Sequence, residues 1–475
     1  MSLELIDPKR HHQLFVDDYA IETTSGTSKT LHSPKKWGPL ISGGVQSRSN
    51  PQWNSEKRIW EWWYDGGAGG YAVSDDGEQW EPRAVGNFDE DNPTLAPSAG
   101  GPGGPMHVVR DETDLDPGRR YKGLLSGSDR YPAVSPDGFH WTLVDTAPIV
   151  SSDESQFTHD VESGQFLAMV KQGTEWGRSV FLSTSADFQE FTEPKLIFHT
   201  DEVDRENRRR RVREVIENPA YLAPPIRDDE DYIAECYNMA VFPYQGLYIG
   251  FPTIFNPFGA APPPGTNHSR INQIELATSR DLYNWERAGN RDLFIGIEPF
   301  DNENYGCCQL LMAGHPIVRE DGEIWCYYNA LRVPGSIAEF REFDRARALF
   351  EIGAIPESFE DGGALSLAKL RPDGFVSIDG GECGQILTKP FELKGEEVYI
   401  NANAEWGEIY AEIVDGETRK PHDGFWVPAE EPAPFTGDST KAKIKWKHPN
   451  DLVFEKPVRL RFYIRQARLF SFWIE

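Results

Sequence analysis

The amino-acid sequence contains one turn pattern four times, and this repeat constrains the fold more than any other feature. In each copy an apolar run leads to a serine, an aspartate follows two residues later, and an aromatic residue follows six residues after the serine. The copies have their serines at Ser74, Ser135, Ser185 and Ser279. The pattern is typical of a hairpin: a strand ends at the serine, the aspartate caps the free amides of the turn, and the aromatic residue packs inward from the return strand. Four copies with both spacings predict a repeated hairpin rather than unrelated turns.

A second hairpin precedes each copy of the turn. Its apolar strands flank a glycine-rich or charged bend, over residues 47–66, 106–127, 155–171, 236–251 and 311–328. The last of these hairpins leads to a weaker fifth copy of the turn at 367–376. Two hairpins per unit make a four-stranded sheet, and five such units over about 370 residues predict a five-bladed β-propeller.

The chain changes character near residue 380. From there to residue 475 it keeps alternating strands without the turn pattern, which predicts a β-sandwich. We therefore expect an all-β chain with a five-bladed β-propeller over residues 1–380 and an accessory β-sandwich over residues 381–475. The composition agrees, because 12% aromatic residues, 43 glycines and 35 prolines favour strands and tight turns over helices.

The composition also argues against several classes of partner. A formal net charge of −28 disfavours nucleic acid or an anionic membrane surface as the main partner. No apolar run approaches the roughly 20 residues that span a bilayer, and the first residues lack the apolar segment of a signal peptide. As written, the sequence suits a cytoplasmic protein, or a periplasmic or secreted protein whose leader has been removed.

The sequence contains no motif for cofactor chemistry. It has no Walker loop, no nucleotide-binding glycine fingerprint, no Gly-x-Ser-x-Gly elbow and no His-Glu-x-x-His zinc motif. The 5 cysteines lack metal-binding spacing and are expected to be reduced core residues. We expect no cofactor and no metal ligand set, and a structural Ca²⁺ or a water in the central channel stays an open alternative.

In a propeller the first strand of each blade lines the central channel, so polar residues there converge. Asp17 and Asp18 interrupt the apolar run 14–22, and a strand of period two would send them to opposite faces, one of them toward the channel. The alternative is a hydrogen-bonded structural aspartate at a strand end. In the second unit Arg110 would keep Asp111 ionised and bind a substrate oxygen, and the alternative is a local ion pair.

The third and fourth units supply further polar candidates. Those of the third unit are Asp153, Glu154, His159 and Asp160. In the fourth unit Glu235 lies within an apolar run, where burial is expected to raise its pKa, the property that a general acid needs. The alternative is a Glu235 that is paired with a nearby arginine.

Other candidates for substrate binding are Arg48, Trp63, Tyr237 and His315. Aromatic rings in this zone could stack on sugar faces, although most are expected to form the blade core, and a lone histidine near a strand is more often structural. The basic run 205–219 is compatible with a helix. It is interpreted as a solvated, salt-bridged helix, with a lid that recognises a carboxylated or sulfated sugar as the alternative.

The turn segment 276–289, "LATSRDLYNWERAG", resembles the Ser-x-Asp-Leu-x-x-Trp-Glu turn of five-bladed propeller glycosidases in glycoside hydrolase families 32 and 43. The segments 14–22, 120–127, 241–251 and 323–330 are similar to those of a bacterial group in that superfamily with a C-terminal β-sandwich. This resemblance covers nearly the whole chain. It implies a propeller that acts on carbohydrate.

Enzymes of these families use an Asp of the first blade, an Asp after an arginine in the second, and a Glu acid. The resemblance assigns these roles to Asp18 (or Asp17), Asp111 and Glu235. Because the family acid lies on the third blade, the alternative acids are Asp153, Glu154 and Asp160. The sequence departs from the family in lacking the Asn-Asp-Pro-Asn motif and a proline after Asp111.

The sequence thus predicts a glycoside hydrolase that acts on a terminal or short-oligosaccharide bond in the propeller funnel. Asp18 would be base or nucleophile, Asp111 would orient substrate, and Glu235 would donate the proton. The alternative is a carbohydrate-binding propeller without catalysis. A sialidase is a third option. However, the sialidase repeat places the aromatic residue seven positions after the serine instead of six, and a sialidase needs an arginine triad, which is not evident here.

Overall fold

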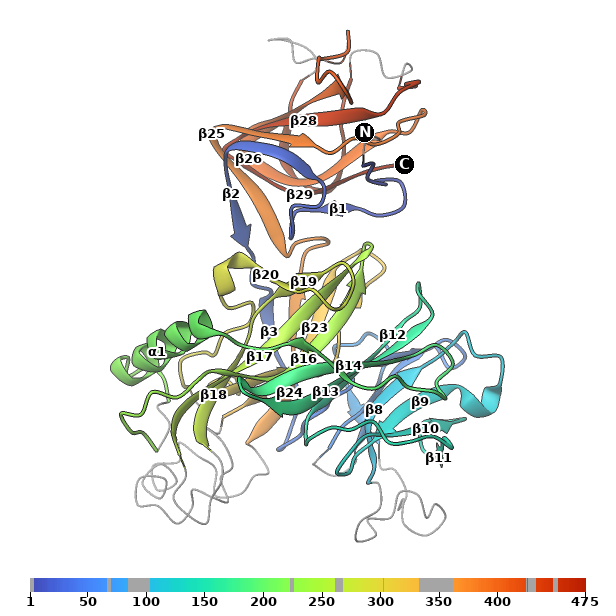
Figure 1. Cartoon of the computed structure of the whole chain (residues 1–475), viewed down its shortest axis with the longest axis vertical. Helices are drawn as coiled ribbons and strands as arrows, with labels where there is room; N and C mark the ends of the chain where they lie inside the picture. Colours follow the sequence, from blue (N-terminus) through green and yellow to red (C-terminus); the bar gives the residue numbers. More distant parts are fainter. Residues whose placement is uncertain are drawn as a thin grey trace.

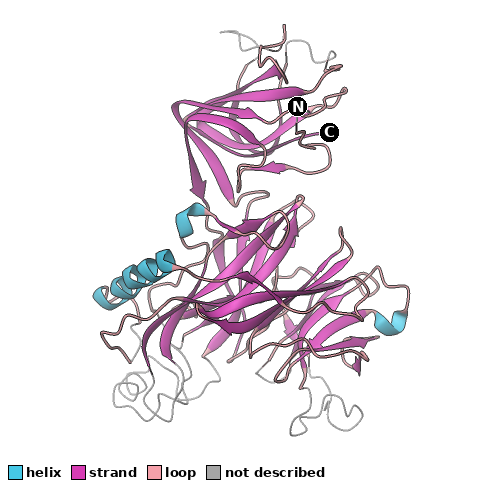
Figure 2. Ribbon diagram, in the orientation of Figure 1, coloured by secondary structure: helices cyan, strands magenta, loops and turns pink. Residues whose placement is uncertain are grey.

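The computed structural model of the chain describes residues 4–65, 70–83, 103–222, 226–260, 268–301, 303–332, 362–423, 425, 433–446 and 452–475. In this part the chain is built from β-strands, together with the helix α1 (Glu202–Glu217) and 3-10 turns at Pro117–Arg119 and Gly289–Arg291 (Figure 1, Figure 2). The chain is therefore all-β, as the sequence predicts. Figure 1 shows a smaller lobe that contains both termini and a larger lobe that contains most of the strands. No helix among the described residues is long and apolar enough to cross a membrane.

In chain order, the first three sheets of the larger lobe are four-stranded and antiparallel. The first sheet contains β4 (Gln52–Asn54), β5 (Ile59–Trp63), β6 (Tyr71–Ser74) and β7 (Glu81–Pro82). The second contains β8 (Pro105–Arg110), β9 (Tyr121–Leu125), β10 (Tyr131–Ser135) and β11 (Thr142–Leu143). The third contains β12 (Ser155–Asp160), β13 (Gln165–Thr174), β14 (Gly177–Ser185) and β15 (Lys195–Phe198). Each sheet consists of the two successive hairpins that the sequence predicts.

A ten-stranded sheet completes the larger lobe. One part contains β16 (Glu235–Tyr244), β17 (Leu247–Ala260), β18 (His268–Ile274), β19 (Ala277–Ser279) and β20 (Glu286–Arg287). The other contains β21 (Gln309–Met312), β22 (Ile317–Val318), β23 (Ile324–Leu331), β24 (Gly363–Leu370) and β3 (Lys35–Ser42). The two parts are joined where β18 pairs with β21 in parallel at Asn272 and Gln309. The outer strand β3 comes from the N-terminal segment and pairs with β24.

Apolar side chains join these four sheets in a closed cycle. Four hydrophobic clusters lie between successive sheets, and they include Trp63 with Tyr121, Leu124 with Phe166, Leu182 with Met239, and Trp62 with Tyr327. The last of these clusters packs the first sheet against β23 and β24 of the ten-stranded sheet. The core of the larger lobe is thus divided among the interfaces between sheets.

The repeated turn has the predicted geometry. In the first copy β6 ends at Ser74, whose hydroxyl donates to Asp76, and Asp76 accepts the amides of Glu78 and Gln79 at 2.8 Å. The Trp80 indole then donates to the carbonyl of Gly77. The copies at Ser135 and Ser279 repeat these bonds, and the copy at Ser185 repeats those of its aspartate. The predicted capping role of the aspartate is confirmed.

The weaker fifth copy behaves differently. Its strand β24 ends before the turn, but the carboxylate of Asp373 accepts hydrogen bonds from Tyr244 and Ser471 at 2.6 Å and lies 2.8 Å from His12. Asp373 is fully buried and joins the larger lobe to the smaller one. The side chain that caps a turn elsewhere is used here for a long-range contact.

The C-terminal sheet differs from the predicted β-sandwich. Its strands are β25 (Val376–Thr388), β26 (Val398–Asp415), β27 (Phe435–Lys443), β28 (Val458–Arg465) and β29 (Ala467–Ile474). β25 pairs with β28, β28 with β26, β26 with β29, and β29 with β25, so these four strands close into a barrel. Two separate layers were expected, but the long strands β25 and β26 change partner along their length, which lets one sheet close on itself.

The N-terminal segment adds two strands to this barrel. β1 (Gln13–Leu14) pairs with β29, and β2 (Ile21–Leu31) pairs with β25 (Figure 1). Ile6, Phe15 and Ala20 are buried in the apolar core of the barrel. The sequence predicts a division between the two domains at residue 380, and this prediction does not include the strands that the start of the chain contributes to the barrel.

The basic run 205–219 forms most of α1, as its helical character predicts. Asp201 caps the helix by accepting the amides of Val203 and Asp204, and Asp204 accepts the amide of Asp201 in return. The helix is only partly solvated. Arg208 and Arg211 are buried, and Arg211 pairs with the buried Glu275 at 2.7 Å. The expectation of a solvated helix is therefore wrong for these two arginines.

Candidate functional site

The first strands of the sheets lie next to one another in the interior of the larger lobe. Side-chain hydrogen bonds of 2.7 to 3.0 Å link Ser49 with Val108, His107 with Ser155, Thr158 with Val241, and Gln156 with Met312. Between β4 and β8, and between β12 and β16, residues with higher numbers on one strand contact residues with higher numbers on the other. The strands of each pair therefore run in the same direction. Residues at the start of each first strand therefore converge at one end.

A group of charged and polar residues occupies that end, and we call it the central polar cluster. Its members are Arg48, Asp65, Asp153, Glu154, Lys171, Arg178, Glu235, Tyr237, Asn238 and Arg270. At its centre the guanidinium of Arg48 binds both oxygens of Glu154, with Nε–Oε2 and Nη2–Oε1 distances of 2.5 and 2.6 Å. Both side chains are buried, and the two-point geometry fixes their orientation.

A chain of hydrogen bonds holds the backbone of Arg48 in place. His107 lies between the Arg48 carbonyl and the Ser155 hydroxyl, both at 2.8 Å. A carbonyl can only accept, so His107 Nδ1 carries the proton and Nε2 accepts from Ser155. Ser155 in turn accepts from Arg130 Nε at 2.6 Å. Burial, with Arg130 and Arg48 nearby, lowers the pKa of His107 to about 3, so this ring is neutral and structural.

Asp153, which precedes the first strand of the third sheet, is an accessible carboxylate of the cluster. Its side chain is 70% exposed and forms an ion pair with the buried Lys171. Burial opposes ionisation of Asp153, but Lys171 outweighs it and lowers its pKa. The Lys171 ammonium also lies 4.3 Å from the centre of the Tyr237 ring. Asp153, Lys171 and Tyr237 thus form one charged face of the cluster.

Asp65 is the cluster's carboxylate with a raised pKa. Surrounding protein disfavours its charged form, and the nearby Glu154 adds to this, while Arg48 opposes it. The residue is nevertheless exposed, and its backbone is fixed by two hydrogen bonds with Gln46 of 2.7 and 3.0 Å. A raised pKa shifts a carboxyl group toward its protonated form, and a protonated carboxyl that contacts solvent can donate its proton to a ligand.

Glu235 lies in the cluster but not in the apolar surroundings that the sequence suggests. Its carboxylate pairs with the guanidinium of Arg178 and accepts the Arg178 amide at 3.1 Å. The alternative interpretation, a glutamate paired with an arginine, is the one that the structure supports. The reason is that Arg178 of the adjacent β14 reaches Glu235 at the start of β16, a contact that the local sequence does not reveal.

Arg270 is the cluster's one cation without a carboxylate partner among the described residues. It lies on β18, and its guanidinium carbon is 5.1 Å from the Phe255 ring centre and 5.7 Å from that of Tyr237. Its Nη1 donates to the carbonyl of His268 at 3.2 Å. Arg48, Lys171 and Arg178 each pair with an acid, so Arg270 differs from them in this respect.

Asp111 lies at the opposite end of the first strands. It follows the last residue of β8, whereas Glu235 begins β16, which separates them by roughly 20 Å at about 3.3 Å per residue. Asp111 is buried, lies 3.1 Å from Lys122 and 3.8 Å from His159, and accepts a hydrogen bond from Thr113. Burial opposes its ionisation, but the bonds from Thr113 and Lys122 lower its pKa.

Other predicted candidates accompany Asp111 at this end. Asp160 accepts from Tyr248 at 2.9 Å and lines a cavity of about 300 Å³ with Arg10 and Glu162. His315 stacks on the ring of Phe242 and contacts its neighbouring carbonyl. Arg110 binds Glu112 and the hydroxyl of Tyr121. These residues do not meet the central polar cluster.

Asp17 and Asp18 lie on a third surface. They occupy a bend between β1 and β2 rather than the predicted strand, because the Asp17 carboxylate accepts the amide of Tyr19 and the Asp18 carbonyl accepts that of Ile21. Asp17 pairs with Arg280, and Asp18, 82% exposed, pairs with Lys29. Both line a cavity of about 610 Å³ beside the turn that contains Asp281 and Trp285. Asp18, Asp111 and Glu235 are therefore not brought together.

Trp63 is part of the core between the first two sheets. Its ring is 5% exposed and contacts Tyr71, Tyr121 and Phe139. It has no surface on which a sugar could stack. The structure thus gathers Arg48, Asp153, Glu154, Glu235 and Tyr237 in one cluster and places the other predicted residues elsewhere.

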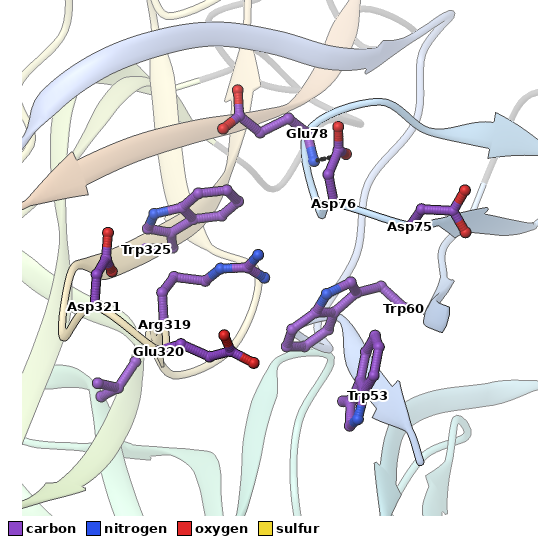
Figure 3. Close-up of a pocket in the computed structure, with 10 residues that line it drawn as sticks. Trp53, Trp60, Asp75, Asp76, Glu78, Arg319, Glu320, Asp321 and Trp325 are labelled. Carbon is purple, nitrogen blue, oxygen red and sulfur yellow. Dashed lines mark hydrogen bonds between the residues drawn. The ribbon is translucent and has the colours of Figure 1, made fainter. Parts of the chain in front are cut away.

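A separate cavity of about 650 Å³ lies between the first sheet and the turn after β22 (Figure 3). Figure 3 shows the Arg319 guanidinium between two tryptophans; it lies 5.2 Å from the Trp60 ring centre and 4.3 Å from that of Trp325. Trp53 is 39% exposed, and Asp75 and several other carboxylates complete the lining. This wall is polar and aromatic.

Five cluster members escaped the sequence predictions, namely Asp65, Lys171, Arg178, Asn238 and Arg270. All but Asn238 lie outside the first strand of their sheet, on which those predictions rested. Lys171 is a charged residue within the apolar run of β13, and Arg270 follows a similar pattern in β18. A buried charge in an apolar strand is the signal that could have identified them.

Within the described residues, no group of three or more His, Cys, Asp or Glu side chains is arranged to hold a metal ion. The predicted Ca²⁺ or water in the channel stays a prediction.

No protein-family model and no curated protein matches the chain. Solved structures that resemble it include the catalytic domain of a family 62 α-L-arabinofuranosidase from Coprinopsis cinerea, with 13% identity, coverage of 71% of this chain and 98% of that one, and a TM-score of 0.40. A family 32 β-fructofuranosidase from Bombyx mori shows 13% identity, coverage of 94% and 93%, and a TM-score of 0.36. An N-acetylgalactosamine deacetylase from F. plautii shows 12% identity, coverage of 73% and 95%, and a TM-score of 0.38. At these TM-scores the similarities do not assign an activity to this chain.

Proposed function

We propose that the chain is a glycoside hydrolase and that the central polar cluster is its catalytic site. In this proposal the sheets of the larger lobe are five blades of a propeller. The three separate sheets are blades one to three, and the ten-stranded sheet merges blades four and five through the β18–β21 pair. The cluster then lies at the end of the funnel where the first strands begin.

One observation carries the proposal: Asp65 has a raised pKa and is exposed beside the ion pair of Arg48 and Glu154. A glycosidase needs a carboxylic acid that stays protonated and a second carboxylate that stays charged. Asp65 suits the first role. Asp153 suits the second, because Lys171 lowers its pKa and most of its side chain is accessible. Arg48 and Tyr237 would contact sugar hydroxyls.

The predicted trio is revised accordingly. Glu235 stays in the site as a substrate-binding residue that Arg178 orients. Asp18 and Asp111 lie outside the cluster and have no role in this mechanism.

The test is the Asp65→Asn variant, measured on a panel of oligosaccharides and on the matching aryl glycosides. We expect turnover of oligosaccharides to fall by roughly 10²–10⁴-fold, because an amide cannot protonate the leaving oxygen. Aryl glycosides with a good leaving group should lose much less. Asp18→Asn, an exposed carboxylate outside the cluster, is the matched control and should keep full activity.

The pH profile provides a second measurement on the same variant. A general acid must be protonated, so the rate of the wild type should fall as the pH rises through the pKa of Asp65. Because that pKa is raised, the fall should occur at a higher pH than for an ordinary aspartate, and it should vanish in Asp65→Asn. If Asp65→Asn and Asp153→Asn both hydrolyse oligosaccharides at the wild-type rate, the assigned site is wrong.

A carbohydrate-binding protein without catalysis is the second candidate. It is favoured by the pairing of Asp153, Glu154 and Glu235 with cations, which leaves Asp65 as the cluster's one carboxylate without an ion-pair partner among the described residues. This candidate predicts saccharide binding with no turnover on any member of the panel and equal affinity in Asp65→Asn.

A further inference from the structure

Arg270 is a buried cation whose hydrogen-bonding capacity is only partly used. The residue is 7% exposed, its Nη1 binds one backbone carbonyl, and its Nε has no acceptor among the described residues. Arginine has five N–H donors arranged to bind planar anions. Within the described part of the chain, no carboxylate forms an ion pair with it. Burying such a group without a counter-ion costs stability.

Its described surroundings are aromatic and cationic and supply no carboxylate in ion-pair contact. Arg270 lies against the rings of Tyr237 and Phe255, and the nearby Arg178 is itself a cation bound to Glu235. Burial lowers the pKa of Arg270. The Tyr237 hydroxyl opposes this, the repulsion from Arg178 adds to it, and Glu154 opposes it to a smaller extent. An external anion would therefore stabilise the charged form of Arg270.

Two buried acceptors lie near the same region. Asn238 Oδ1 and Gln156 Oε1 have no hydrogen-bond partner in the part of the chain that the structure describes. Asn238 also donates to Glu154 at 3.4 Å, which places it in the cluster. Sugar hydroxyls are donors that match such oxygens. The cluster thus presents a cation that could bind a carboxylate and acceptor oxygens that could bind sugar hydroxyls.

We infer that Arg270 binds the carboxylate of an acidic sugar, so that the ligand of the central polar cluster is a saccharide containing a uronic acid. This rests on the proposed function for the identity of the site. The planar carboxylate fits the guanidinium fork, and the sugar ring would contact Tyr237. The net charge of −28 does not prevent this, because charges more than about 8 Å away are largely screened at physiological salt.

The experiment measures binding without turnover, by calorimetry and ligand-observed NMR. The probes are the methyl glycosides of glucuronic and galacturonic acid, short oligogalacturonides, and the neutral methyl glucosides and galactosides. We expect at least one acidic probe to bind roughly tenfold or more tightly than its neutral counterpart. Arg270→Gln should remove that preference, and Arg270→Lys should restore it only in part because lysine lacks the fork.

Arg319→Gln is the matched control. Arg319 also lies between aromatic rings and has no acidic ion-pair partner in the described residues, but it lines the separate cavity of Figure 3. This variant should keep the preference for the acid. The inference is overturned if no acidic probe binds or if Arg270→Gln keeps the preference.

Thermal unfolding separates a ligand-binding arginine from a structural one. Without ligand, Arg270→Gln should melt at the same or a higher temperature than the wild type, because an unpaired buried charge is removed. Arg211→Gln, which breaks the buried pair with Glu275, should melt at a lower temperature. A large loss of stability in Arg270→Gln would make it a structural residue and contradict the inference.

The outcomes for the two proposals are distinguishable. Acid-selective binding without hydrolysis would keep the inference and reject the hydrolase. Hydrolysis of neutral oligosaccharides that is lost in Asp65→Asn but unchanged in Arg270→Gln would keep the hydrolase and reject the acidic ligand.

Discussion

Single residues in this chain take their properties from neighbours that lie far away in the sequence. Asp65 shows this most clearly. Nothing in its local sequence marks it. Its pKa is raised first by the surrounding protein and then by Glu154, while Arg48 opposes the shift, and both of these residues belong to other segments. Glu235 shows the converse. Its apolar flanks predicted a raised pKa, but Arg178 lies within hydrogen-bond distance and provides a counter-charge.

A glycine at one repeated turn supports a prediction at this scale. Gly138 has a φ of +84°, and a Cβ atom there would overlap the ring of Trp63. Gly138→Ala should therefore lower the free energy of unfolding by roughly 1–3 kcal/mol, through both the backbone conformation and the overlap. Denaturant unfolding of the variant and the wild type measures this difference in free energy.

Gly164→Ala is the control for that substitution. Its φ of +69° is similar, but nothing lies within 4 Å of the added atom. The difference between the two variants isolates the contact with Trp63. Equal losses in the two variants would show that the turn, and not the packing, decides the cost.

At the scale of elements, the helix α1 and the repeated turns follow from short-range hydrogen bonds. The Ser-x-Asp turns were predicted because donor and acceptor lie two or three residues apart. The capping box of α1 is equally local. The packing of α1 was not predicted, because Arg208 reaches Pro257 and Arg211 reaches Glu275 across large sequence separations.

The cap of α1 gives a pH-dependent prediction. Pairing with Arg291, together with the amides of Asp204 and Val203, lowers the pKa of Asp201 to about 2. Asp201→Ala should cost about 1–2 kcal/mol at neutral pH. A lowered carboxylate pKa stabilises the fold above the unfolded value near 4, and this contribution is lost as the pH falls through the folded value.

The measurement for Asp201→Ala is denaturant unfolding of both proteins at pH 7 and at several values between pH 4 and pH 2. The difference between variant and wild type should narrow as the pH falls. Glu202→Ala, which changes an exposed residue in the first turn of the helix, should show a smaller difference at every pH. A difference for Asp201→Ala that does not change with pH would contradict the role of the carboxylate.

At the scale of the whole molecule, the start of the chain holds the two lobes together. β1 and β2 belong to the C-terminal barrel, and β3 completes the outer edge of the ten-stranded sheet. A chain that lacks residues 1–31 would expose the edges of β25 and β29 and would lose Ile6, Phe15 and Ala20 from the barrel core.

Truncation tests this arrangement. A chain of residues 32–475 should aggregate on size-exclusion chromatography and melt at a lower temperature than the full chain. Removal of residues 1–5, which stops before the buried Ile6, is the control and should change neither property. If the 32–475 chain is monodisperse and equally stable, the N-terminal strands are not required by the barrel.

The sequence by itself determined the features that depend on neighbouring residues. It gave the all-β class, the repeated turns with their aspartate caps, the paired hairpins and the helix over 205–219. These rest on spacings of a few residues, where backbone hydrogen bonds and side-chain caps decide the conformation. It also indicated Arg48, Asp153, Glu154, Glu235 and Tyr237 as candidates, because each begins or precedes a first strand.

Only the tertiary structure decided which of these candidates meet. Arg48 and Glu154 are 106 residues apart, and their two-point contact exists because the first strands of different sheets lie in register. The same packing sends Asp111 to the opposite end and places Asp17 and Asp18 on another surface. The closure of the C-terminal barrel and the pairing of β1 and β2 with its strands likewise depend on contacts between residues far apart in the sequence. Such contacts are set by the packing of whole sheets, which no local pattern encodes.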